Sequence, residues 1–81
     1  MNIFVGNLSH ATAEGELRQA FEAHGQVMTA KVITDKYSGV SKGFGFVEMP
    51  DQVQAQAAID GLNGTELQGR AITVNVAHPR G

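Results

Sequence analysis

The apolar residues of this chain change their spacing several times, from the alternation typical of a β-strand to the three- and four-residue spacing of a helix. These changes divide the chain into six short elements. Their order is strand, helix, strand, strand, helix, strand, which is the split βαβ arrangement. It predicts an α+β, ferredoxin-like fold, in which a four-stranded antiparallel sheet has both helices on one face and leaves the other face open.

Capping and turn-forming residues indicate where these elements begin and end. The expected strands cover residues 2–6, 27–34, 44–49 and 71–77. Thr12 stands where the N-cap of the first helix should be, and Gly25 follows that helix as a stop signal. Asp51 should cap the second helix. The apolar positions of that helix are Ala55, Ala58, Ile59 and Leu62. Residues 35–43 are expected to form a loop, and residues 63–70 a turn-rich connection with room for a small hairpin.

Length and composition limit the chain to one small domain, expected to occupy residues 1–81. Cysteine is absent, which excludes disulfides and thiolate zinc sites. No apolar run approaches the roughly 20 residues of a membrane span, and the first residues lack the features of a secretion signal. We therefore expect a soluble, cytoplasmic protein with no membrane partner. The three histidines are widely scattered, so neither a metal nor a cofactor is expected.

Strand alternation assigns the phenylalanines to a face before any resemblance is considered. In the first strand, Phe4 shares its face with the polar Asn2. The residues that share the corresponding face of the third strand are Lys42, Phe44, Phe46 and Glu48. Burying such charged groups without partners is costly, so this face is expected to be the open one.

The other two strands add polar and small groups to the same open face. Alternation places Lys31 and Ile33 of the second strand there, and it places Thr73, Asn75 and Ala77 of the last strand beside them. The opposite face of the third strand holds Gly43, Gly45 and Val47, which should contact the helices.

Three of the four phenylalanines are thus expected on the surface. Fully burying one would stabilise the fold by about 1.5–3 kcal/mol, which a small domain would ordinarily use. An exposed apolar cluster rimmed by polar groups usually marks a binding surface. The alternative is a different register that places these rings in the core, but it would bury Asn2, Lys42 and Glu48 with them.

The residues of this face also resemble a known pattern. KGFGFVEM (Lys42 to Met49) resembles the RNP octapeptide of RNA recognition motifs, and IFVGNL (Ile3 to Leu8) resembles the companion hexapeptide. The spacing of the two segments, the order of elements and the AxxAIxxLNG pattern of the second helix are similar too. The resemblance covers essentially the whole chain and extends, within the family, to small single-domain proteins of bacterial type.

This resemblance implies binding of single-stranded RNA, in a post-transcriptional or RNA-chaperone role. Bases would stack on Phe4 and on Phe44 or Phe46, and Lys42 would meet a phosphate. The last strand and exit segment would contribute Asn75, Ala77, His78 and Arg80. Asn7 has two interpretations, an RNA contact or a residue that fixes the turn after the first strand. The other groups expected at the RNA site are Asn2, Lys31, Ile33 and Glu48.

The net charge of −2 is unevenly distributed along the chain. The expected helices hold five acidic residues and one arginine, whereas strands and loops have a positive excess. Few cations are therefore available to a bound strand, so we expect stacking to supply most of the affinity. Binding should be weak and only weakly dependent on salt. The acidic helical face is most simply a solvated surface, and a docking site for a protein partner is the alternative.

Other functions fit the fold less well. An enzyme like the acylphosphatases would need an arginine in the loop after the first strand, and residues 6–12 contain none. Neither a cysteine nucleophile nor a convincing Ser–His–Asp spacing is present, so we expect no catalysis. A peptide-binding module would tend to lack the exposed aromatics. Single-stranded DNA stays an alternative ligand, because stacking does not distinguish sugars. We expect a monomer.

Overall fold

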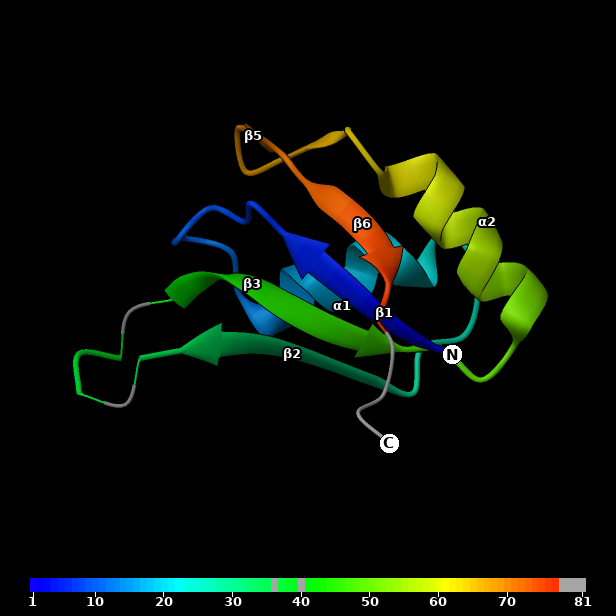
Figure 1. The fold of residues 1–81 in the computed structure, drawn as a ribbon, viewed down its shortest axis with the longest axis horizontal. Helices are drawn as coiled ribbons and strands as arrows, with labels where there is room; N and C mark the ends of the chain where they lie inside the picture. The colour runs from blue at the N-terminus through cyan, green and yellow to red at the C-terminus, as the bar shows by residue number, and fades with distance from the viewer. Residues whose placement is uncertain (36, 40, 78–81) are drawn as a thin grey trace.

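The computed structural model describes residues 1–35, 37–39 and 41–77, and of Ser41 and Lys42 only the backbone. The elements are β1 (Asn2–Gly6), α1 (Glu14–Glu22), β2 (Thr29–Thr34), β3 (Ser41–Glu48), α2 (Gln52–Leu62), β4 (Glu66–Leu67), β5 (Arg70–Ala71) and β6 (Thr73–Val76). One antiparallel sheet has the strand order β2-β3-β1-β6, and β4 and β5 form a hairpin. α1 contacts β2 and α2 contacts β6 on one side of this sheet (Figure 1). The predicted ferredoxin-like arrangement is confirmed.

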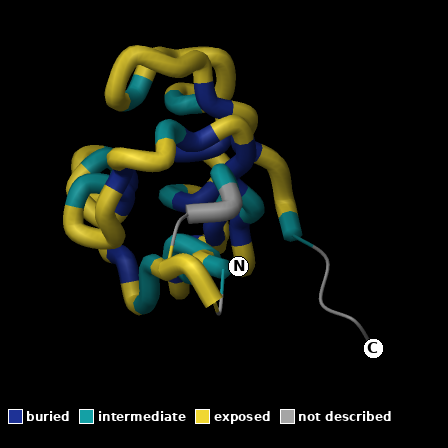
Figure 2. Tube along the Cα trace, turned by 90° about the vertical axis from the view of Figure 1, so that its left-hand side faces the viewer, coloured by how far each residue is buried: buried dark blue, intermediate teal, exposed yellow. Residues whose placement is uncertain are grey.

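The core lies between the sheet and the two helices. Ile3, Val5 and Val74 point inward from their strands and are completely buried. The helices contribute Leu17, Phe21, Ala55, Ala58 and Ile59. Figure 2 shows the buried segments gathered in the interior of the molecule. The inward alternation expected from the sequence is therefore confirmed for these strands. In the described part of the chain, no helix has the length and apolar character needed to cross a lipid bilayer.

The start of α2 agrees with the sequence. The Asp51 side chain accepts hydrogen bonds from the backbone N–H groups of Val53 (2.8 Å) and Gln54 (3.0 Å). These are donors of the first turn, which have no partner within a helix, so the carboxylate satisfies them and fixes the first residue of α2.

The start of α1 does not agree, and the expected N-cap at Thr12 is wrong. The cap is Ala13, and it is the Glu16 carboxylate that accepts a hydrogen bond from the Ala13 backbone N–H (3.3 Å). Thr12 is instead buried, and its hydroxyl oxygen has no hydrogen-bond partner among the described atoms. The helix also ends at Glu22, ahead of the expected stop at Gly25.

The first residues of β2 and β3 differ from the expected ones. β2 begins at Thr29, two residues late, whereas β3 begins at Ser41, three residues early, so β3 extends into the segment expected to be a loop. Val32 pairs with Gly45 while Thr34 pairs with Ser41, so Ile33 lies opposite three residues of β3. This bulge accommodates a positive φ of 85° at Gly43, a conformation that glycine adopts readily.

The last part of the chain is divided in two. Ala71, expected in the final strand, pairs with Glu66 in the β4–β5 hairpin, whereas β6 begins at Thr73. The small hairpin is therefore confirmed. Gln68 and Gly69 both have positive φ (53° and 80°), as in the two-residue turns that suit the twist of a hairpin.

Gly45 is buried and lies very close to the neighbouring strand. A Cβ atom there would collide with the carbonyl oxygen of Lys31 on β2. The neighbouring atom is backbone and belongs to a paired strand, so it cannot move aside cheaply. The glycine is needed for the close approach of β2 and β3.

Replacing Gly45 with alanine should therefore lower the free energy of unfolding by about 1–3 kcal/mol, the usual cost of overpacking. Urea unfolding followed by far-UV circular dichroism would measure this change. Gly15→Ala is the matched control, because no atom lies within 4 Å of its added Cβ. That variant should be stabilised by up to about 1 kcal/mol, since alanine favours helix. Equal stability of Gly45→Ala and the unmodified protein would contradict the collision.

Candidate nucleic-acid interface

Four side chains from four strands form a row across the open face of the sheet. Phe4 pairs with Phe46 on one side and with Asn75 on the other, and Phe46 pairs with Lys31. Residues paired in this way point to the same face. That face lies opposite the buried residues Ile3 and Val74, so the outward placement of the phenylalanines is confirmed.

The three phenylalanines contact one another. The centroids of Phe4 and Phe44 are 6.0 Å apart with their planes at 29°, and Phe46 meets both rings edge-on at 5.8 and 6.2 Å. Phe46 is 40% exposed, whereas Phe4 and Phe44 are half-buried. In the cluster of Phe4, Phe44 and Phe46, each ring is therefore held in place by contacts with the other two. Offset and edge-on contacts of this kind stabilise by about 0.5–1.5 kcal/mol per pair.

Gly6 makes room for this cluster. A Cβ atom at Gly6 would lie 2.8 Å from Cε2 of Phe4, so any larger residue would push the ring away from the sheet. Ile33 extends the open face beyond Phe44, by alternation from Lys31, and is half-buried. The apolar part of the surface therefore lies toward the β2–β3 bulge.

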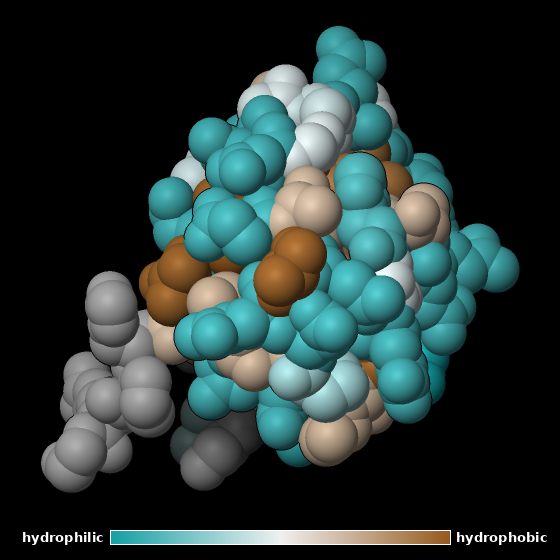
Figure 3. Space-filling model, turned by 90° about the vertical axis from the view of Figure 1, so that its right-hand side faces the viewer, coloured by the Kyte–Doolittle hydropathy of each residue, from teal (hydrophilic) through white to brown (hydrophobic). Residues whose placement is uncertain are grey.

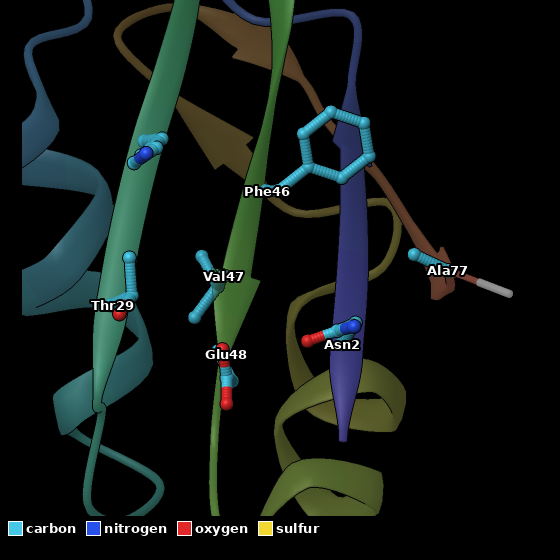
Figure 4. Close-up of a pocket in the computed structure, with 7 residues that line it drawn as sticks. Asn2, Thr29, Phe46, Val47, Glu48 and Ala77 are labelled. Atoms are coloured by element: carbon cyan, nitrogen blue, oxygen red, sulfur yellow. The ribbon is translucent and has the colours of Figure 1, made fainter. Parts of the chain in front are cut away.

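The opposite end of the open face is polar. Thr29 and Asn2 both pair with Glu48, and the backbone N–H of Ala77 donates a hydrogen bond to the carbonyl oxygen of Asn2 (2.9 Å). Figure 4 shows Asn2, Glu48 and Thr29 beside one another on three strands, below the ring of Phe46. The sequence placed Asn2, Glu48 and Ala77 at the site, and the structure brings them together.

Asn7 has a role inside the protein. Its Nδ2 donates a hydrogen bond to the carbonyl oxygen of Ala71 (2.7 Å), and its Oδ1 accepts one from Nη2 of Arg70 (2.7 Å). Its φ of 58° is one that asparagine tolerates better than most residues. Of the two interpretations of Asn7, the structure favours the one in which it fixes the turn after β1.

Arg70 is a candidate site residue that the sequence did not identify. Asn7 holds its guanidinium group beside the end of β1, whose last residue, Gly6, pairs with Thr73 on β6. No local pattern could have revealed this, because the contact joins residues 63 positions apart. Three further predicted RNA contacts, the Lys42 side chain, His78 and Arg80, lie outside the part of the chain that the structure describes.

Away from the open face, the charged groups serve local structure. Arg18 pairs with Glu22 (3.2 Å) on α1 and also donates a hydrogen bond to the carbonyl oxygen of Val27 (3.1 Å). Both side chains of the pair are nearly half exposed, so its contribution to stability is small. On the side that includes α2, the surface is largely hydrophilic with only separate apolar spots (Figure 3).

The β2–β3 loop contains an ordered carboxylate. Backbone N–H groups of Tyr37 (2.8 Å) and Ser38 (3.2 Å) donate hydrogen bonds to Oδ1 of Asp35. These bonds favour the ionised form and hold the pKa of Asp35 below its usual value. Within the described ranges, no group of three or more acidic or histidine side chains is arranged to hold a metal ion.

Comparison with known proteins agrees with this geometry. Residues 3–73 match the model of the RNA recognition motif family. The chain belongs to that family. A glycine-rich RNA-binding protein of Brassica napus is 49% identical over 78 residues, which are 96% of this chain and 46% of the relative. A glycine-rich RNA-binding protein of Daucus carota is also 49% identical, over 96% of this chain and 50% of its own length.

This RNA recognition motif spans about half the length of these curated relatives. Both come from plants, so the expected likeness to bacterial members stays a prediction. Among solved structures, RNA binding protein PG1 superposes with a TM-score of 0.94 at 46% identity, covering 100% of this chain and 98% of the other. A Sex-lethal protein–RNA complex gives 0.92 at 31% identity, covering 99% of this chain and 48% of the other.

The contacts among the three rings change the expected effect of removing Phe46. Full exposure would have made the substitution nearly neutral, but Phe46→Ala should lower the free energy of unfolding by about 1–2 kcal/mol, because it removes two ring contacts. Phe21→Ala, in the core, should cost about 3–5 kcal/mol. Urea unfolding of both variants measures the difference. Equal losses would mean that Phe46 belongs to the core.

Proposed function

We propose that this protein binds single-stranded RNA across the open face of its sheet, with bases stacked on Phe4 and on Phe44 or Phe46. The observation that supports this most is the cluster of three rings on the face away from the helices. Aromatic rings held in advance bind bases without a further ordering cost. The family, named for recognition of RNA, and relatives named as RNA-binding proteins favour a binding module over an enzyme.

The distribution of charge supports binding led by stacking. Three lysine and arginine side chains are described: Arg18, Lys31 and Arg70. Arg18 is on α1 and pairs with Glu22, which leaves Lys31 on the open face and Arg70 at its edge. With Lys42 and Arg80 as further predicted contacts, few phosphates can be neutralised, so the affinity of the isolated protein is low.

Several finer features stay proposals. Single-stranded DNA is the alternative ligand, since nothing in a stacking surface requires a ribose. A monomer, a cytoplasmic location, a post-transcriptional or RNA-chaperone role and a bacterial type are expected from the sequence alone. An acidic protein-docking face on the helices is the alternative use of the other side of the molecule.

Removing Phe44 and Phe46 together tests the proposal directly, because either ring can serve as the second stacking platform. The double variant Phe44→Ala, Phe46→Ala should bind a fluorescent random single-stranded RNA at least about 5-fold more weakly, since it loses one stacked base, which contributes about 1–3 kcal/mol. Fluorescence anisotropy measures the dissociation constants. Val53→Ala is the control, because this exposed apolar residue is on α2. Unchanged binding by a folded double variant would rule out the stacking mechanism.

Salt dependence tests the small number of phosphate contacts. For single strands the slope of log K against log salt is about −0.7 per neutralised phosphate, so three or four contacts predict a slope of about −2 to −3. The same titration repeated between 50 and 300 mM potassium chloride gives this slope. A slope twice as steep would show that phosphates dominate the affinity.

A further inference from the structure

A pocket lies beside the most exposed ring of the cluster. It has a volume of about 350 Å³ and is lined by Asn2, Thr29, Lys31, Phe46, Val47, Glu48 and Ala77. Phe46 forms one boundary of it, and the row Thr29–Glu48–Asn2 forms the other (Figure 4). Glu48 is two residues from Phe46 along β3, or about 7 Å, a distance that a base stacked on the ring can bridge with its edge.

The polar side chains of this pocket have no hydrogen-bond or ion-pair partner among the residues that the structure describes. No hydrogen bond or ion pair joins the side chains of Asn2, Thr29, Lys31 or Glu48 to any residue of the described ranges. Lys31 and Glu48 line the same pocket yet do not form an ion pair with each other. Glu48 is half-buried, so a ligand that covers Phe46 would remove water from its carboxylate without replacing the lost hydrogen bonds, unless the ligand itself donates them.

The chemistry of Glu48 favours one base. An ionised carboxylate only accepts hydrogen bonds, and it accepts two in parallel with good geometry. The Watson–Crick edge of guanine offers two adjacent donors, N1–H and the 2-amino group. Adenine and cytosine offer one amino group beside an acceptor, and uracil offers one N–H between two carbonyl oxygens, which would face the carboxylate. The Asn2 amide, directly across from Glu48, can donate to O6 of guanine.

We propose that this pocket selects guanine, with Glu48 as the specificity-determining residue and Asn2 as its partner. This rests on the proposed function, because the base reaches the pocket only when it stacks on Phe46. Lys31 offsets the repulsion between the Glu48 carboxylate and the phosphates of the bound strand. Uracil is rejected because it would leave the covered carboxylate with too few donors.

A position scan tests the proposal. Eight-nucleotide RNAs of uridine, each with guanosine at one position in turn, are titrated by fluorescence anisotropy. Guanosine should raise the affinity about 5- to 100-fold at one position, the range for a good bidentate contact to a base. At that position inosine, which lacks the 2-amino group, should lose most of the gain, whereas 7-deazaguanosine, which keeps the whole Watson–Crick edge, should retain it.

Glu48→Gln tests the residue. A glutamine amide can both donate and accept, which matches adenine, so this variant should lose the preference for guanosine and prefer adenosine at the same position. Glu66→Gln, an exposed glutamate of the β4–β5 hairpin, makes the same change of charge and should keep the guanosine preference. Thermal unfolding should show both variants folded, because the Glu48 side chain makes no hydrogen bond within the described residues.

The possible outcomes separate this inference from the proposed function. Equal affinity for all eight RNAs, with binding still weakened by Phe44→Ala, Phe46→Ala, would overturn the guanine pocket and leave RNA binding intact. A guanosine preference that persists in Glu48→Gln would overturn the role of Glu48. Failure of the unmodified protein to bind any of the RNAs would overturn both.

Discussion

Both helices pack against one side of the β2-β3-β1-β6 sheet, and each strand residue is thereby assigned either to the core or to the open face. Because side chains alternate along a strand, Ile3 and Val5 can be buried only if Phe4 is not. The same holds for Phe46 next to Val47. A core built from one face of a sheet therefore presents whatever the sequence places at the alternate positions, here three aromatic rings.

Such a surface has a cost that the molecule partly offsets. A domain of this size has little apolar surface to spare, and rings left in water contribute less to stability than buried ones. Phe4, Phe44 and Phe46 shelter one another, and Gly6 lets the ring of Phe4 lie close to the sheet. The contacts that recover some of this stability also fix the rings in place, which reduces the entropy lost when a ligand covers them.

Local patterns were sufficient for the order of the elements, the inward and outward residues of the strands and the cap of α2 at Asp51. They failed at the start of α1, and also where residues far apart in the chain meet. Ala13 caps α1 with the help of Glu16, while Thr12 is buried. Asn7 and Arg70 meet only because the β4–β5 hairpin returns to the end of β1. Predicting the pocket beside Phe46 requires the register in which β1, β2 and β3 pair, and alternation within a single strand does not reveal this register.

Gly45 has a consequence for how this family is recognised in sequences. It stands between two phenylalanines of the GFGF segment, yet what requires a glycine there is the carbonyl oxygen of Lys31 on the neighbouring strand. A descendant that exchanged RNA for another ligand would be free to replace Phe44 and Phe46 but would still need the glycine. The glycine of this motif is thus required by the fold, whereas the aromatic residues are required by the ligand. A sequence search that gives both kinds of position equal weight will assign RNA binding to proteins that have kept only the fold.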